Sequence, residues 1–500
     1  MRKASFLPLV AAIVSSILTG CGMNSFTPTS TSSADSVPVS LTMTDDPPSG
    51  VSVLFFQVSL TDASLTPATG SAVSLLSNNT PIQIDVTKLQ ALSAFLSTAN
   101  VPAGTYNSLS LTFASPQLVI FNASDQSIAS TCAVGTVCQL TPTIDNSATV
   151  TLSSDPFPVT VAANSPLGFL VDFHLNTIIQ SDLSVNLAAS NGVTVSQLPQ
   201  QHPRFGSLAG TVASVTASSN EFTVQTLWGK TFTIDSNTST TYDDFPTSAC
   251  MTGSISCLAV GQFVQVDVAS VVSAGTLLAD QVTYLQAAGQ ETVEGTIVGF
   301  NATQMKLILH DCPSNNSDLP LGGEATVTFA SGTTFSVDAN GFTIPAGMVF
   351  TGTENLAAGQ EVQVNVATGT LTNASSPTMT GGWGPPRSLS FTTNNVELEP
   401  SQITGSVASI DSTSTSFTLG GFPNFFSGPW ANSAAWQAAI DTTTQTTYQN
   451  FTTDSFSGLA TGDIVSVNGW LFETDNGLAD PTVTSPVVLA QTVTMHSNGW

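Results

Sequence analysis

The stretch Val260-Gly-Gln-Phe-Val-Gln-Val-Asp-Val268 is a glycine turn followed by alternating apolar and polar residues. The same pattern returns at Ala358-Gly-Gln-Glu-Val-Gln-Val-Asn-Val366 and at Thr461-Gly-Asp-Ile-Val-Ser-Val-Asn-Gly469. Alternation with a period of two is typical of a strand with one buried face. Recurrence of the pattern about every hundred residues indicates a tandem array of similar β domains.

A second glycine opens each repeat, at Gly210, Gly295 and Gly405, within a short apolar strand. Glycine lets a strand bend sharply because it has no Cβ to collide with the neighbouring strand. Several bent strands of this kind suit a small, partly open OB-like barrel. We therefore expect three small OB-like β-barrel repeats at residues 205–286, 290–399 and 401–498, forming a string of separately folded units.

The region 38–198 predicts a different β domain, a β-sandwich of short strands separated by Gly, Pro, Asn and Asp turns. Leu89, Leu92, Phe95 and Leu96 recur at helical spacing, so one short helix is expected here. The whole chain is thus predicted to be all-β, a sandwich followed by barrels.

Two families known only as domains of unknown function resemble these regions. The order Thr44-Asp-Asp-Pro47, a long strand, Asp85-Val-Thr-Lys-Leu89 and then Pro102-Ala-Gly-Thr-Tyr106 resembles DUF4382. The Ala-Gly-Thr-Tyr step is also similar to transthyretin/Ig-like sandwiches. The threefold glycine pattern resembles DUF5666, a family often found in tandem in envelope lipoproteins. The resemblance implies a sandwich and three barrels, and it implies no activity.

The first residues resemble the signal of bacterial lipoproteins. The basic Met1-Arg-Lys3 precedes an apolar run that ends in Leu18-Thr-Gly-Cys21. In that family the chain is cut before the cysteine, which is then acylated. We therefore expect a signal peptide at 1–20, a lipid anchor on Cys21 and a Ser/Thr/Pro tether over 21–37. Gly22, where an inner-membrane retention signal has Asp, favours the outer membrane, on either its periplasmic or its surface face.

Four of the other cysteines form two close pairs, Cys132 with Cys138 and Cys250 with Cys257. Export to an oxidising compartment favours two short disulfides. A metal site is the alternative, but it would need thiolates two to four residues apart together with further ligands. Cys312 is left over, and the sequence does not decide whether it is buried or reactive.

The composition excludes several classes of function. Seven Lys and Arg face 33 Asp and Glu, a net charge of −26, so the chain lacks the cations that nucleic-acid binding requires. Hydrolase, zinc-protease and nucleotide-binding motifs are absent from the sequence. We expect no catalytic residues, metal or cofactor.

Tryptophans in Gly/Pro-rich stretches are the strongest binding candidates, at Trp383, Trp430 and Trp436. An exposed aromatic ring can stack on a sugar or anchor a protein partner, but the same rings can close the ends of barrels. The expected function is a non-enzymatic, lipid-anchored envelope protein with a structural or adhesive role, touching glycan or another envelope protein. The alternatives are a carbohydrate-binding array that uses these three tryptophans, and an enzyme of unrecognised type.

Overall fold

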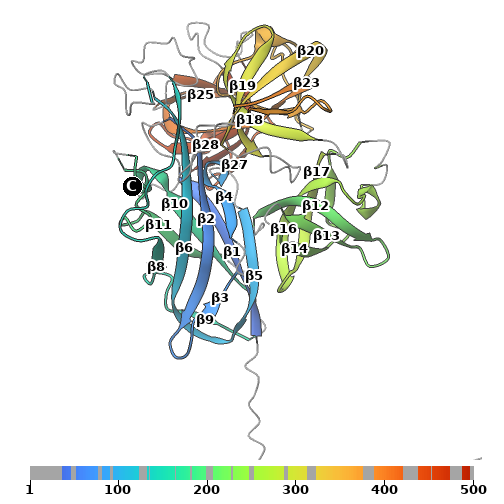
Figure 1. Ribbon diagram of the computed structural model, residues 1–500. Helices are drawn as coiled ribbons and strands as arrows, with labels where there is room; N and C mark the ends of the chain where they lie inside the picture. The colour runs from blue at the N-terminus through green and yellow to red at the C-terminus, as the bar shows by residue number, and fades with distance from the viewer. Residues whose placement is uncertain are drawn as a thin grey trace, which may run out of the picture.

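The structure is a computed structural model in which nearly all ordered elements are strands (Figure 1). It describes residues 36–495 except 47–51, 77–80, 90–93, 123–131, 134–135, 164, 181–182, 199–205, 227–228, 247–249, 251–252, 287–290, 312–321, 340, 375–387, 421–436, 452 and 473–486. Within this part of the chain, no helix has the length and hydropathy needed to cross a bilayer.

The N-terminal domain is a sandwich of two sheets. One sheet has the order β11 (Val193–Leu198), β10 (Leu167–His174), β1 (Ser36–Asp46), β5 (Ala94–Pro102). The other is built on the long pair β2 (Ser52–Pro67) and β6 (Gly104–Phe121), extended by β3 (Val73–Ser74), β4 (Ile82–Asp85), β7 (Val137–Leu140), β8 (Thr149–Leu152) and β9 (Val159–Val161). Strand β1 pairs parallel with β10 and antiparallel with β5, so this sheet is mixed.

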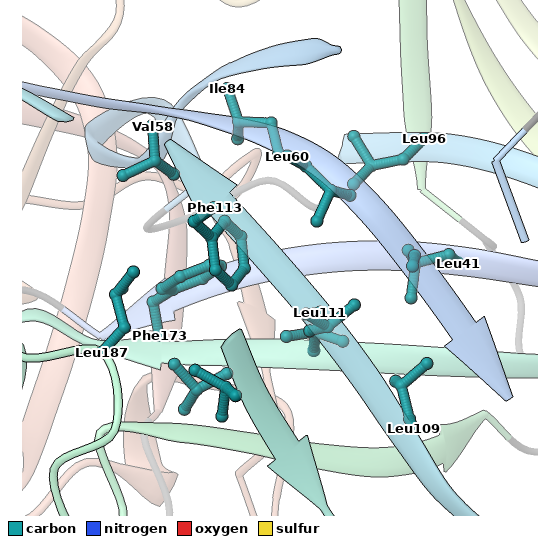
Figure 2. Close-up of a cluster of buried hydrophobic side chains, with 14 of the residues drawn as sticks. Leu41, Val58, Leu60, Ile84, Leu96, Leu109, Leu111, Phe113, Phe173 and Leu187 are labelled. Atoms are coloured by element: carbon teal, nitrogen blue, oxygen red, sulfur yellow. The ribbon is translucent and has the colours of Figure 1, made fainter. Parts of the chain in front are cut away.

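Inward-facing side chains of both sheets form the core of the sandwich (Figure 2). Leu109, Leu111 and Phe113 alternate along β6 and are all buried. Phe113 meets Phe173 of the opposite sheet edge-to-face, with ring centroids 5.5 Å apart. At the hairpin before β6, the buried Tyr106 hydroxyl donates to the Pro102 carbonyl at 2.8 Å. The Pro-Ala-Gly-Thr-Tyr step therefore feeds a core strand, as its pattern predicts.

The short helix expected from Leu89 to Leu96 is wrong. Val86–Leu89 forms a single 3₁₀ turn, and Phe95 and Leu96 lie on strand β5. Both side chains are buried because β5 is covered on its two faces: Leu96 packs in the sandwich core and Phe95 packs in the first barrel. A strand buried on both faces loses its alternation and can mimic a helical pattern. The one α-helical turn is α1 (Leu175–Ile178) among the described residues.

Three barrels follow, and each closes through the same circuit of five strands. The first contains β12 (Ser207–Thr216), β13 (Glu221–Thr226), β14 (Thr231–Asp235), β16 (Phe263–Ser273) and β17 (Thr276–Gln286). The second contains β18 (Thr292–Phe300), β19 (Gln304–Asp311), β20 (Glu324–Val337), β21 (Glu361–Asn365) and β23 (Ser388–Glu399). The third contains β24 (Ser401–Asp411), β25 (Ser416–Gly420), β26 (Gln437–Asp441), β28 (Ile464–Phe472) and β29 (Val487–Met495).

In chain order within each barrel, strand one pairs with two, two with three, three with five, five with four and four with one. The three–five pair is parallel in every case. The barrels differ in one added strand. β15 (Thr241–Asp243) and β27 (Thr447–Gln449) lie parallel to the fifth strand, whereas β22 (Thr372–Ala374) of the middle barrel lies antiparallel to it.

The glycine turn that recurs in the sequence is also the same turn in space. Gly261, Gly359 and Gly462 have φ angles of +90°, +92° and +93°. Their amides donate to the carbonyls of Val212, Ile297 and Val407 at 2.8, 2.9 and 2.8 Å. The next side chain, Gln262, Gln360 or Asp463, accepts from the amide three residues earlier at 2.7 Å each time. The left-handed backbone explains why glycine stands at these positions.

Close packing explains two of the opening glycines. A Cβ at Gly210 would collide with the Gln225 carbonyl oxygen, and one at Gly295 with that of Ile308. The first strand of each barrel then bulges a few residues later, at 212–214, 297–299 and 407–409. Bulges bend a strand and increase its twist, as a small closed barrel requires.

The units do not fold as a string of isolated domains, because neighbouring units share apolar cores. Phe95, Leu170 and Leu198 of the sandwich pack with the core of the first barrel. Trp470 of the third barrel is fully buried in the core of the second, where its indole N–H donates to the Asp338 carbonyl at 2.8 Å. The first barrel therefore packs beside the sandwich, and the second and third pack as a pair at one end of it (Figure 1).

Candidate functional site: the buried junction at His310

Most of the binding residues predicted from the sequence lie outside the described residues. Cys21, Trp383, Trp430, Trp436 and Cys312 all fall there. The four remaining cysteines are described, and each close pair is joined. Cys132 and Cys138 form one disulfide, with Cα atoms 5.3 Å apart, and Cys250 and Cys257 form the other, at 4.5 Å.

The described residues bring titratable groups together at the junction between the sandwich and the second barrel. Its apolar part is a small cluster made of Leu54, Phe55, Val119 and Phe121 from the sandwich and Ile308 and Ala358 from the barrel. His310, near the end of β19, lies beside this cluster, and its ring is 5.9 Å from that of Phe55.

His310 connects carboxylates of two domains. Its Nδ1 lies 3.1 Å from Asp85 Oδ2 at the end of β4, 225 residues away in the chain. Its Nε2 lies 2.6 Å from Thr296 Oγ1 on β18 and 3.7 Å from Glu361 Oε1 on β21. The Thr296 hydroxyl also donates to Glu361. The side chains of His310, Asp85 and Glu361 are only 3%, 9% and 15% exposed.

Donors and acceptors fix where hydrogens must lie in this network. Ionised carboxylates only accept hydrogen bonds, and a hydroxyl has a single hydrogen to give. When Thr296 donates to Glu361, its oxygen must accept from Nε2 of His310. Nδ1 must in turn donate to Asp85, whose other oxygen already accepts from the Thr87 amide at 3.1 Å. All contacts are satisfied together when both ring nitrogens carry hydrogen.

The order Asp85, His310, Thr296 resembles a nucleophile with its base and orienting acid, but burial argues against catalysis. Thr296 is 5% exposed and its hydroxyl is already donated to Glu361, so a substrate has no access to it. Nor do the described residues contain a cluster of three or more His, Cys, Asp or Glu able to hold a metal ion. The network therefore links the two domains through hydrogen bonds, and its His310–Asp85 contact is an ion pair when both ring nitrogens carry hydrogen.

A second group of titratable residues involves the first and second barrels. The pKa of Asp244 is raised to about 6, first by loss of hydration and then by the charges of Asp338, Asp243 and Glu397. Loss of hydration and the charge of Asp338 also raise the pKa of Glu397. Carboxylates of the two barrels thus repel one another, in contrast to the attraction at His310.

A buried lysine lies in the first barrel. The Lys230 ammonium is 4.7 Å from the centre of the Phe232 ring, and burial lowers its pKa to about 8. Its Nζ has no hydrogen-bond partner among the described residues. The ammonium is therefore stabilised by a cation–π contact with the Phe232 ring.

Comparison with known proteins identifies two families. Residues 36–190 match the family model described as Domain of unknown function (DUF4382), and residues 209–283 match that of Domain of unknown function (DUF5666). No curated protein matches the chain. The two matches cover the sandwich and the first barrel, where the sequence resembled the same families. Their descriptions assign no activity.

The sequence did not indicate the junction. His310 belongs to no recognised motif, and Asp85 stands in the segment Asp85–Leu89 that resembles DUF4382. The partners Thr296 and Glu361 carry no motif, and the network joins distant segments: Asp85 lies 225 residues from His310, and Glu361 lies 65 residues from Thr296. A signal was present only in composition: His310 is one of four histidines in a chain with little charge.

Proposed function

We propose that this protein is a non-enzymatic, lipid-anchored protein of the bacterial cell envelope with a structural or adhesive role. The observation that carries the proposal is the continuous packing of four β units through shared cores and a buried ion-pair junction. Such a molecule keeps its surfaces in a fixed arrangement, which suits the presentation of contacts to a partner.

In the proposed anchor, the sulfur of Cys21 carries a diacylglycerol and its amine carries a third acyl chain. The tether over residues 21–37 connects this anchor to the sandwich. This part rests on the order of basic residues, apolar run and Leu-Thr-Gly-Cys in the sequence. Three acyl chains would bury enough CH₂ groups for stable attachment. A high negative charge keeps the exposed domains soluble and limits adsorption to anionic surfaces.

Mass spectrometry of the protein purified from membranes tests the anchor. We expect an N-terminus at residue 21 carrying acyl groups, and a Cys21→Ser variant that is released from the membrane with unchanged fold. A mature protein that retains residues 1–20, or that carries no acyl group, contradicts the anchor. Protease treatment of intact cells then separates a surface role from a periplasmic one, because only surface-exposed barrels are cleaved.

We further propose that the three barrels are OB-like and that all three are DUF5666 repeats. The shared five-strand circuit and the shared turn at Gly261, Gly359 and Gly462 support this assignment. OB-folds bind oligosaccharides partly through the connection between their fourth and fifth strands. In the second barrel that connection, between β21 and β23, includes Trp383 in the sequence, which favours glycan as a ligand.

A glycan pull-down from envelope fractions tests this ligand. The variant with Trp383, Trp430 and Trp436 changed to Ala should lose retention. A matched control is Phe300→Ala, which removes a 43%-exposed aromatic ring from the second barrel. Equal retention of the wild-type and triple variant rules out tryptophan-mediated glycan binding and leaves a protein partner as the adhesive contact.

A further inference from the structure

The described chain divides into two bodies, each held by a shared core. The sandwich and first barrel, residues 36–286, are joined by Phe95, Leu170 and Leu198. The second and third barrels, residues 291–495, are joined by the core around Trp470. The third barrel is also fixed to the second by the Gln360 side-chain amide, which donates to the Leu471 carbonyl at 2.9 Å.

The contact between the two bodies is of a different kind. Its apolar cluster has six buried residues, far fewer than the cores on either side. The ion pair between His310 and Asp85 lies at this contact, almost fully buried. Breaking a buried pair by removing one charge is costly because the other charge stays desolvated. The orientation of the bodies therefore depends strongly on this network.

We propose that the junction is a proton-dependent latch, which holds the pair of C-terminal barrels against the sandwich while both ring nitrogens of His310 carry hydrogen and releases them when one hydrogen is lost. The carboxylates facing the ring are Asp85 from β4 and Glu361 from β21. Thr296 from β18 and the Phe55 ring from β2 contribute no charge. Asp85 and Glu361 are thus the acids of the described residues that lie within 4 Å of the ring nitrogens, and a ring with hydrogen on both nitrogens carries the positive charge that offsets them.

Loss of the hydrogen from either ring nitrogen of His310 removes a hydrogen bond from this network. Either Asp85 loses its donor, or the Thr296 oxygen loses its donor and the hydroxyl must turn away from Glu361. Each case leaves one oxygen of a buried carboxylate facing an acceptor or without the donor that the network supplied, which costs free energy in a buried site. Opening the contact exposes these groups to water and relieves the cost. Histidine is the side chain suited to such a change near neutral pH.

The other carboxylates between the two bodies also favour release at higher pH. A test of the latch must therefore distinguish their effect from that of His310. Asp244 of the first barrel faces the charges of Asp338 and Glu397 of the second. These charges repel more strongly as pH rises, so they also favour release. An Asp244→Asn variant removes the central member of this group while leaving His310 intact.

Small-angle X-ray scattering of the full chain at about pH 5.5 and about pH 8.5 tests the latch, because histidine charge changes between these values. We expect the wild-type radius of gyration to rise at the higher pH by roughly a tenth over the value for a compact chain of this size. Asp244→Asn should retain most of this rise. His310→Gln should be expanded at both pH values, since Gln cannot supply the positive ring.

His174→Gln is the matched control, because it makes the same change at a partly buried histidine that lies on the sandwich and contacts Thr194 at 3.3 Å. It should behave as the wild type does. Circular dichroism at both pH values identifies any variant that fails to fold, and Thr296→Val then replaces His310→Gln as the variant that breaks the network. A wild-type radius that does not change with pH, or a change that persists in His310→Gln, overturns the latch.

Discussion

The first and third barrels have the same internal structure and different attachments. In both, a buried threonine connects a loop to the last strand: Thr240 donates to the Ala279 carbonyl at 2.8 Å, and Thr446 to that of Ala490 at 2.7 Å. In both, a tyrosine at the next-but-one position packs against a phenylalanine, with ring centroids 6.1 and 5.9 Å apart. The first and third barrels are thus built with the same residue types at matching positions.

The difference lies on the fourth strand. In the first barrel Val268 pairs with Ala279 and Ser270 with Leu278, and in the third Gly469 pairs with Ala490 and Trp470 with Leu489, so Ser270 holds the place of Trp470. Trp470 enters the core of the second barrel, whereas the strand carrying Ser270 lies near β1 and β5 of the sandwich. The comparison teaches that one set of residues closes the barrel and a separate, smaller set selects its neighbour.

The largest expected effect comes from removing the residue that distinguishes the third barrel. Trp470→Ala leaves a large cavity and an Asp338 carbonyl without its donor. We expect a loss of about 3–5 kcal/mol in the unfolding free energy of the C-terminal pair. Denaturant unfolding measures this loss. It should be monitored by circular dichroism of the backbone, because tryptophan fluorescence changes with the substitution itself.

Phe300→Ala is the control for this prediction, since its ring is exposed and should contribute less than about 0.5 kcal/mol. If Trp470→Ala were equally mild, the indole would not hold the second and third barrels together. Ser270→Trp gives the converse test: it should weaken the attachment of the first barrel to the sandwich by overpacking.

An intermediate effect is expected at the turn that all three barrels share. At Gly462 the backbone φ is +93° and a Cβ would meet no atom within 4 Å, so Gly462→Ala tests the backbone alone. The left-handed conformation should cost about 1–2 kcal/mol in thermal unfolding. Gly104→Ala, at an equally open position with an ordinary φ, should cost less. Equal costs at the two glycines would show that the turn does not need glycine.

The smallest effect concerns Asp244, where the third barrel has Asn450; both have positive φ, at 60° and 64°. The pKa of Asp244 is raised to about 6, so its protonated form favours folding: that stability is present below about pH 4 and is lost as pH rises through about 6. Asp244→Asn should therefore stabilise the protein at pH 7 and not at pH 4. Because the residue is largely exposed, the gain should stay below about 1 kcal/mol. Chemical unfolding at the two pH values measures it, and a gain that is equal at both would contradict the repulsion.

The sequence predicted those elements of the fold that are determined by residues close together in the chain. The glycine turns, the alternating strands and the Pro-Ala-Gly-Thr-Tyr hairpin were all visible in the sequence, and the all-β architecture followed from them. The helix predicted over Leu89–Leu96 failed because one face of β5 is covered by the sandwich core and the other by the first barrel. Contacts between distant segments, such as His310 with Asp85 or Trp470 with Asp338, leave no periodic signal, so neither the junction nor the pairing of barrels could be inferred.

Hydrogen exchange measured by mass spectrometry in increasing denaturant tests most directly whether the chain is two paired bodies. We predict that peptides of β12 to β17 lose protection together with the sandwich, and peptides of β18 to β23 together with those of β24 to β29. Loss of protection by the second barrel in step with the sandwich, or by each barrel independently, would contradict the shared cores on which the proposed role depends.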